Sequence, residues 1–233
     1  MPAQDDAREN RIVDLFNLDR PANRVRHGTD AILEIDGRIL EFELKSTTIA
    51  KGGISTVRDL GKAHIEKWRE KHWIIGIYSG DKLLECKYGT PDAMAPWIDK
   101  VWTYIAPDFE VAEHLPPVIT EQEMIAVIGD KAFYSLEDAK KLHKLQYSAA
   151  EYRNLMDLAG GYSKERMLDI FRDRAKYLIE RGSTLNNPKI TPEYFMSWPS
   201  ITKDHAGILR ELIRAWLVSQ PPASTSATEQ ATA

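Results

Sequence analysis

Hydrophobic and polar positions alternate most regularly between Asp30 and Lys45. Apolar residues occupy every second position on both sides of Asp36-Gly37, a pair that is a strong signal for a two-residue β-turn. The pattern therefore predicts a β-hairpin with one continuous apolar face. That face consists of Ala31, Leu33, Ile35, Leu40, Phe42 and Leu44.

Other periodic segments flank this hairpin and predict an α/β fold class. Helical periodicity, strand-like apolar runs and Gly- or Pro-containing breaks follow one another over the first half of the chain. In chain order, we expect a helix at 5–18, a loop at 51–53, a helix at 57–71, strands at 73–78 and 83–88, a helix at 93–105 and a linker at 107–117.

From residue 120 onward the pattern is helical. Thr120 and Ser148 are each followed three residues later by a glutamate, which is the capping-box signature of a helix start. Ser163 can cap a further helix that runs to Arg181, and we expect short helices after Thr191 and at 208–218. We therefore predict a mixed-sheet α/β core at 1–117, a C-terminal helical lobe at 118–219 and a disordered tail at 220–233.

The amino-acid composition narrows the possible classes of protein. The net charge of −4 excludes a wholly basic, histone-like binder, although local fields matter more than the total. Cys86 is the single cysteine, so an internal disulfide and a cysteine-rich zinc site are both excluded. The acidic N-terminus does not resemble a signal peptide, and the apolar runs are too short for a bilayer. We expect a soluble, cytoplasmic protein without membrane contact.

The register of the hairpin places candidate chemistry on its polar face. A two-residue turn at Asp36-Gly37 puts Asp30 opposite Glu43, and Lys45 lies on the same face because side chains alternate by two. Two neighbouring carboxylates repel each other, and a divalent cation relieves the conflict. Mg²⁺ commonly takes one or two carboxylates, with water and phosphate completing its shell.

An acid-x-lysine triplet is weak evidence by itself. The chain contains three of them, beginning at Glu43, Glu85 and Asp138. Only the first has a carboxylate placed opposite it in a predicted ladder. A solvated strand face carrying glutamate and lysine remains the alternative interpretation of the hairpin.

Asp30, followed after twelve residues by Glu43-Leu44-Lys45, resembles the motif of the PD-(D/E)XK nuclease superfamily. The order of elements over about residues 5–90 is similar to that of a type II restriction endonuclease. The resemblance implies that Asp30 and Glu43 bind Mg²⁺, for which Mn²⁺ may substitute, and that Lys45 assists the attacking water. It also suggests Glu9 as an accessory residue. Thr29 stands where the superfamily name has proline.

Polar residues after the hairpin are candidates for DNA contacts. We expect hydroxyl and basic side chains there to bind phosphates, because such groups supply many backbone contacts. These candidates are Ser46, Thr47, Lys51, Arg58 and Lys67. A polar strand end followed by an ordinary loop is the alternative.

The function expected from these features is Mg²⁺-dependent hydrolysis of double-stranded DNA at a specific sequence. We expect a homodimer, with the helical lobe contributing to dimerisation or base recognition, and a cognate DNA methyltransferase as functional partner. Two alternatives stay open. One is a nuclease of the same superfamily for DNA repair or phage DNA processing, and the other is a non-catalytic DNA-binding protein.

Overall fold

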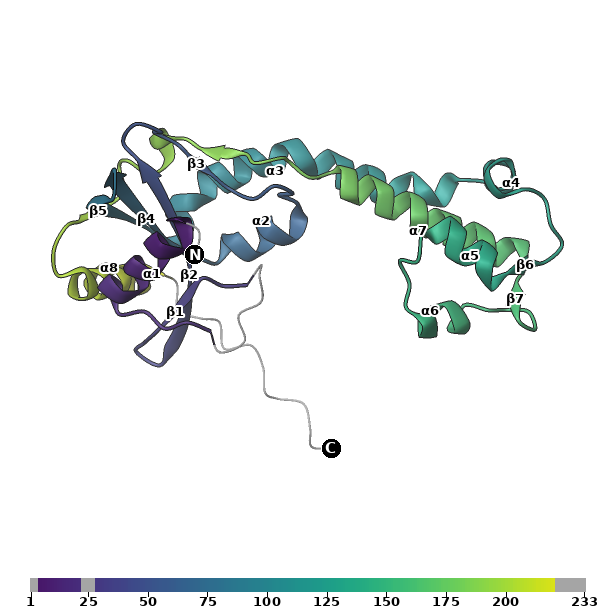
Figure 1. The fold of residues 1–233 in the computed structure, drawn as a ribbon, viewed down its shortest axis with the longest axis horizontal. Helices are drawn as coiled ribbons and strands as arrows, with labels where there is room; N and C mark the ends of the chain where they lie inside the picture. The colour runs from purple at the N-terminus through teal and green to yellow at the C-terminus, as the bar shows by residue number, and fades with distance from the viewer. Residues whose placement is uncertain (1–3, 22–27, 221–233) are drawn as a thin grey trace. The chain divides into compact units, whose positions relative to one another are not determined.

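A computed structural model of the protein describes residues 4–21 and 28–220. This part of the chain has a mixed α/β fold, as predicted, with one five-stranded mixed sheet and about eight helices. It divides into two compact units (Figure 1). We call them the sheet unit, which spans the described parts of 1–56, 65–99 and 189–220, and the helical unit, which spans 57–64 and 100–188.

The sheet has the strand order β1-β2-β4-β5-β9. Its strands are β1 (Ala31–Ile35), β2 (Arg38–Thr48), β4 (His72–Ser79), β5 (Lys82–Gly89) and β9 (Ser200–Ile201). Only β2 and β4 run parallel, and the other neighbours are antiparallel. A parallel pair needs a crossover connection, which here contains helix α2.

The β1–β2 hairpin has the predicted register. Leu33 pairs with Leu40, and Ala31 pairs with Phe42. The turn residues Asp36 and Gly37 have φ angles of 50° and 75°, and a type I′ turn requires positive φ at both positions. The predicted face is apolar and turned inward, with Leu40 partly buried and its other five residues buried.

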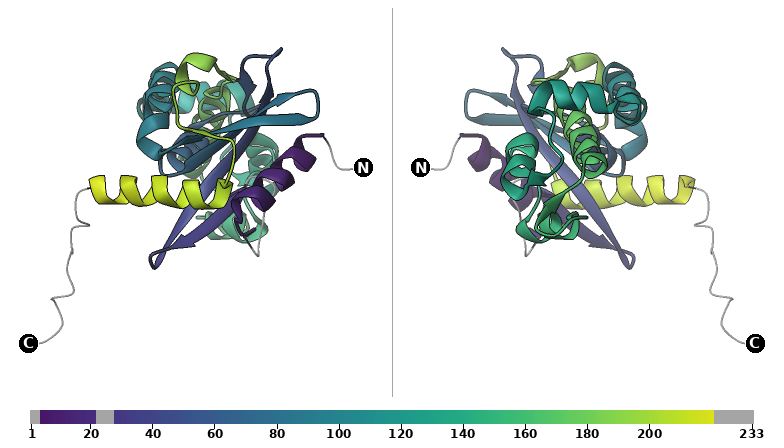
Figure 2. Two further views of the ribbon diagram at one scale, coloured as in Figure 1. Left: turned by 90° about the vertical axis from the view of Figure 1, so that its left-hand side faces the viewer. Right: turned by 90° about the vertical axis from the view of Figure 1, so that its right-hand side faces the viewer.

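Helices α1 (Gln4–Phe16) and α8 (His205–Ser219) cover this apolar face. They lie side by side (Figure 2), and the guanidinium of Arg210 donates to the carbonyl oxygens of Phe16 and Asn17. Leu209 and Ile213 of α8 are fully buried in the same core as the hairpin. The C-terminal helix is therefore part of the sheet unit.

The opposite face of the sheet packs against aromatic residues. Trp68 of α2 (Lys62–Arg69) lies edge-to-face on Trp73 of β4, with ring centroids 5.3 Å apart. Trp97, in the first part of α3 (Pro91–His114), lies 6.0 Å from Trp68. Such aromatic contacts add to the free energy gained from area burial alone.

The predicted helix at 57–71 was wrong at its beginning, because α2 starts only at Lys62. The preceding backbone bonds to a distant segment. Strand β3 (Ile54–Ser55) pairs with β8 (Lys189–Ile190), and Leu60 forms a bridge with Leu185. These non-local hydrogen bonds compete with helix formation and keep the residues before Lys62 out of the helix.

The predicted linker at 107–117 was also wrong. Helix α3 continues through Pro107 to His114, and a 3₁₀ turn, η1 (Pro116–Val118), follows it. Proline costs a helix one backbone hydrogen bond. The helix nevertheless continues, and beyond Pro107 its Ala112 is buried and its Glu113 forms a 2.6 Å ion pair with Lys176.

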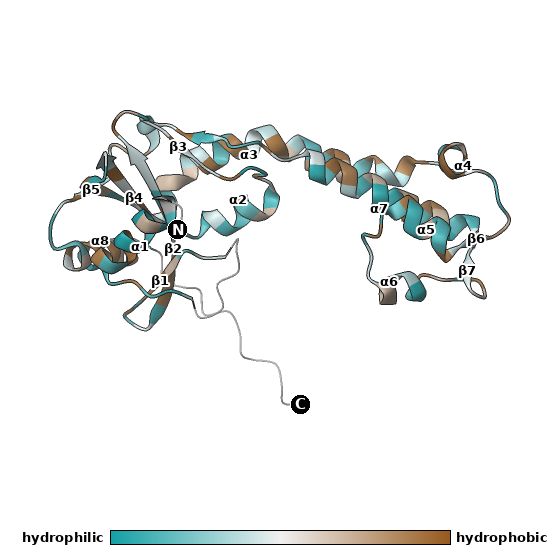
Figure 3. Ribbon diagram, in the orientation of Figure 1, coloured by the Kyte–Doolittle hydropathy of each residue, from teal (hydrophilic) through white to brown (hydrophobic). Residues whose placement is uncertain are grey.

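The helical unit has its own core. It contains α4 (Glu121–Ile128), α5 (Leu136–His143), α6 (Ala149–Asn154), α7 (Lys164–Gly182) and the ribbon of β6 (Tyr134–Ser135) with β7 (Gly161–Tyr162). The capping boxes at Thr120 and Ser148 are confirmed, as is the cap at Ser163. Helix α7 carries both hydrophobic and hydrophilic residues along its length (Figure 3), as expected for a helix with one buried side.

The two compact units do not follow the predicted boundary at 117/118. Residues 189–220, expected in the helical lobe, pair with the sheet through β9 and enter its core through α8. Within this stretch the expected short helix after Thr191 is the 3₁₀ turn η2 (Pro192–Tyr194). The predicted tail lies outside the described residues except for Gln220. Across 4–21 and 28–220, no helix combines the length and apolar character that crossing a bilayer requires.

Candidate active site

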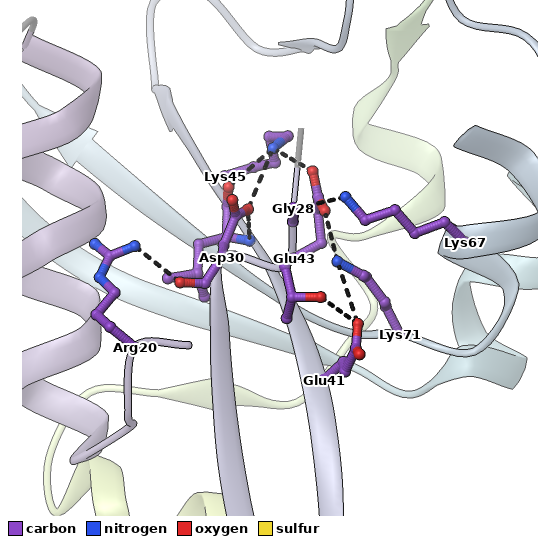
Figure 4. A network of polar contacts seen from close by, with 10 residues as sticks. Arg20, Gly28, Asp30, Glu41, Glu43, Lys45, Lys67 and Lys71 are labelled. Carbon is purple, nitrogen blue, oxygen red and sulfur yellow. Dashed lines mark hydrogen bonds and ion pairs between the residues drawn. The ribbon is translucent and has the colours of Figure 1, made fainter. Parts of the chain in front are cut away.

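Three side chains meet on the polar face of the hairpin. The Nζ atom of Lys45 lies 2.6 Å from Oε1 of Glu43 and 3.8 Å from Oδ2 of Asp30 (Figure 4). Glu43 and Lys45 are both on β2, and Asp30 directly precedes β1. The structure therefore brings together the three residues that the hairpin register selected.

The carboxylate of Asp30 is held across the hairpin. Its Oδ2 accepts a 2.9 Å hydrogen bond from the backbone N–H of Leu44. The guanidinium of Arg20 donates to the carbonyl oxygen of Asp30 at 2.8 Å. A fixed backbone donor leaves the carboxylate little rotational freedom, which is the preorganisation that a binding or catalytic group needs.

Glu43 is a buried carboxylate, with only 5% of its surface exposed. Burial raises the pKa of Glu43, but the ammonium group of Lys45, followed by Lys71 and Lys67, outweighs burial and holds the pKa below its ordinary value. Glu43 is therefore ionised at neutral pH. An ionised carboxylate is what a hard cation requires as a ligand.

Lys45 carries a stable positive charge. Burial lowers the pKa of Lys45, but Glu43 and then Asp30 raise it well above the ordinary range. The charge of Glu9 acts in the same direction. At neutral pH this side chain donates hydrogen bonds and stabilises negative charge, and it has no free lone pair to accept a proton.

Sequence reasoning missed Lys71, whose side chain is only 1% exposed. Its Nζ lies 3.6 Å from Oε2 of Glu43 and 3.7 Å from Oε2 of Glu41. Burial lowers the pKa of Lys71, and the two carboxylates counteract only part of that effect. No local pattern could reveal this contact, since it depends on the parallel pairing of Phe42 with His72.

A polar pocket of about 180 Å³ adjoins Lys45. Its lining includes four residues that the sequence analysis singled out and two hydroxyl residues that it did not. The full lining is Glu9, Lys45, Ser46, Lys51, Ile54, Ser55 and Thr56. Ser55 lies at the end of β3, and Thr56 directly follows it. The predicted contacts Ser46 and Lys51 thus share one cavity beside the site.

The other predicted DNA contacts lie elsewhere. Thr47 is buried, and its hydroxyl donates to the carbonyl oxygen of Gly53 at 2.9 Å, so it supports the loop. Lys67 donates to the carbonyl oxygen of Gly28 at 2.5 Å and lies next to the site (Figure 4). Arg58 is exposed in a turn of the helical unit.

The residues present fit a hard divalent cation. Among the described residues, no three His, Cys, Asp or Glu side chains gather closely enough to hold a metal ion. Mg²⁺ does not need such a cluster, because one or two carboxylates suffice when water and phosphate supply the other ligands. Oε2 of Glu43 is buried and has no hydrogen-bond partner in the described part of the chain, which leaves an oxygen available for a cation.

The other two acid-x-lysine triplets have different roles. Glu85 pairs with Lys87 at 3.1 Å and accepts a hydrogen bond from the hydroxyl of Ser200. Asp138 completes the capping box of α5 with Ser135. Among the described residues, only the first triplet has a lysine that lies within 4 Å of two carboxylates.

No protein-family model matches the chain, and no curated protein matches it in sequence. A function must therefore be argued from the site and its geometry.

Proposed function

We propose that the protein is a Mg²⁺-dependent DNA endonuclease of the PD-(D/E)XK type that acts as a type II restriction enzyme. The observation that carries the proposal is the placement of two carboxylates within 4 Å of one partly buried ammonium on the β1–β2 hairpin. The mixed sheet and the order of elements around the hairpin agree with the superfamily resemblance.

Asp30 and Glu43 would hold Mg²⁺, or Mn²⁺ in its place, and the ion would supply Lewis-acid activation of water and phosphate. The protein side chains have separate tasks. Lys45, kept charged by its two partners, donates a hydrogen bond to the attacking water or to a phosphate oxygen and stabilises the negative charge that develops there. Glu9, beside Lys45 in the pocket, is the accessory acidic group.

The pocket beside Lys45 is suited to a neighbouring phosphate of the same DNA strand. Hydroxyl groups and ammonium groups are the usual phosphate contacts, and Ser46, Ser55, Thr56 and Lys51 supply both kinds. Lys67 fixes Gly28 near the site, and Arg58 is an exposed cation for non-specific backbone contact. These contacts determine position and affinity, and they carry no sequence information.

A restriction enzyme must cut both strands, and each chain has one such hairpin. We therefore propose a homodimer on double-stranded DNA, because two-fold symmetry matches a palindromic site. The helical unit is the candidate for dimer contacts or base recognition. A cognate DNA methyltransferase would protect the host sequence.

Cleavage of plasmid DNA by the purified protein with Mg²⁺ tests the proposal. Discrete bands are expected, and Glu43→Gln, which keeps the size of the side chain and removes its charge, should produce none. A smear or structure-dependent nicks would indicate a repair or processing nuclease. Absence of cleavage with either Mg²⁺ or Mn²⁺, together with DNA binding, would indicate a non-catalytic binder and reject the enzyme.

A further inference from the structure

Lys71, the buried lysine beside Glu43, has no evident task in the catalytic scheme. We infer that Lys71 is a positioning residue that holds Oε2 of Glu43 and thereby weakens divalent-cation binding until DNA is present. This inference rests on the proposed function, because it assumes that Glu43 is a metal ligand.

The contact between the two residues is unusual in its geometry. Nζ of Lys71 and Oε2 of Glu43 are both buried, and neither has a hydrogen-bond partner in the described part of the chain. They lie 3.6 Å apart, which is an ion-pair distance and too long for a hydrogen bond. Two buried polar atoms that face each other without a hydrogen bond cost the folded protein free energy. We therefore look for a function of the gap between them.

Each oxygen of Glu43 consequently faces an amine. Lys45 lies 2.6 Å from Oε1, and Lys71 lies 3.6 Å from Oε2. The position of Lys71 is itself fixed, since Glu41 lies 3.7 Å away and accepts a hydrogen bond from the hydroxyl of Thr29. The two carboxylates therefore attract the amine and favour its position beside Glu43 when a cation approaches.

A divalent cation on Glu43 would lie close to two positive groups, and repulsion at that range is large in a partly desolvated site. A DNA phosphate at the site brings negative charge that compensates this repulsion. Metal and DNA should therefore favour each other's binding, and the coupling is reciprocal by thermodynamic necessity. Removing the charge at residue 71 should tighten metal binding to the free protein and reduce the coupling.

Calorimetric titration of the DNA-free protein with Mn²⁺ tests this inference. Lys71→Met should bind Mn²⁺ at least roughly tenfold more tightly than the wild-type protein, because it keeps the apolar stem and removes one nearby charge. Lys71→Arg, which keeps the charge, should retain weak binding. The matched control is Lys87→Met, since Lys87 is also buried but pairs with Glu85. That control should stay within about twofold of wild type, because an interaction with a more distant charge is weaker.

Unchanged or weaker Mn²⁺ binding by Lys71→Met, in a protein that still unfolds cooperatively on heating, overturns the inference. A merely structural lysine would leave metal affinity unchanged or reduce it. Glu43→Gln distinguishes a failure of this inference from a failure of the proposed function. If Mn²⁺ binding depends on Glu43 but does not respond to Lys71→Met, only this inference fails. If no form of the protein shows Glu43-dependent binding, the proposed function fails with it.

Discussion

At the scale of single residues, the site depends on burial as much as on proximity. Glu43 is ionised although it is buried, because amines lie near both of its oxygens. A buried charge that loses its partner is strongly destabilising. Changes at the site therefore require a test of folding as well as a test of activity.

Alanine at Asp30, Glu43 or Lys45 is expected to abolish DNA cleavage. Under the proposed function, each change removes either a cation ligand or the ammonium that stabilises developing charge, and the loss of one such group typically costs a factor of 100 or more in rate. Plasmid cleavage with Mg²⁺ measures the effect. Glu85→Ala, in the second acid-x-lysine triplet, is the control and should retain activity. Cleavage by Glu43→Ala with loss of activity in Glu85→Ala would move the site to that triplet.

His72 is expected to make the stability of the protein depend on pH. Its ring stacks on Tyr88, with Nδ1 2.7 Å from the tyrosine hydroxyl. Burial lowers the pKa of His72 from 6.5 to about 4, and Asp92 opposes only a part of this shift. The unfolded chain binds a proton below about pH 6.5, while the folded protein does so only near pH 4. Stability is therefore fully present above pH 6.5 and falls by about 3 kcal/mol as the pH drops to 4.

Urea unfolding between pH 4 and 7.5 measures this dependence. His72→Gln, which does not titrate, should flatten the curve over that window. His114→Gln is the matched control because His114 is 81% exposed, and its curve should follow that of the wild-type protein. An unaltered slope in His72→Gln would assign the pH dependence to other groups.

At the scale of secondary-structure elements, local sequence patterns were sufficient to predict the hairpin but not the elements that lie next to it. The turn Asp36-Gly37 and the alternation around it fix the register within the hairpin, so the gathering of Asp30, Glu43 and Lys45 could be predicted. The pairing of β2 with β4 has no turn to fix it, and the position of Lys71 could therefore not be predicted. The start of α2 and the length of α3 were wrong for the same reason, since contacts with distant segments decide both.

Glycine is expected to be required at position 37 only because of its backbone conformation. Its φ is +75°, and a side chain there would meet no atom within 4 Å. Gly37→Ala should therefore reduce the free energy of unfolding by about 1–2 kcal/mol, which is the cost of a left-handed backbone for a residue with a Cβ. Gly182 is the control because it is equally open but lies in helix α7 without a positive φ. Gly182→Ala should be neutral or stabilising by up to about 1 kcal/mol in thermal or urea unfolding, and equal destabilisation by both changes would contradict this explanation.

At the scale of the whole molecule, the net charge of −4 gives no attraction for DNA, so the proposed DNA binding depends on a local group of cations. Lys51→Ala is expected to weaken binding to all DNA sequences and to flatten the salt dependence by about one unit. Lys82→Ala is the matched control, since Lys82 is an exposed lysine of the same unit at the start of β5. Fluorescence anisotropy with Ca²⁺ at several salt concentrations measures both slopes. Identical slopes for the two variants would show that Lys51 in the pocket does not contact DNA phosphates.

The oligomeric state is a property of the whole assembly. Under the proposed function, sedimentation of the protein with a cognate duplex is expected to show two chains per duplex, because the described part of each chain has one such set of ligands and a restriction enzyme cuts two strands. A single chain that cuts both strands at one site without a nicked intermediate would contradict the dimer.

The return of α8 to the hairpin also affects how the protein is made. The apolar face of the hairpin is synthesised well before α8, which covers it through Leu209 and Ile213. Until α8 is made, the nascent chain exposes an unprotected apolar surface, of the kind that chaperones and proteases bind. A chain that terminates before residue 205 should therefore be degraded or aggregate. The position of α8 thus makes synthesis beyond residue 213 a condition for a stable sheet unit.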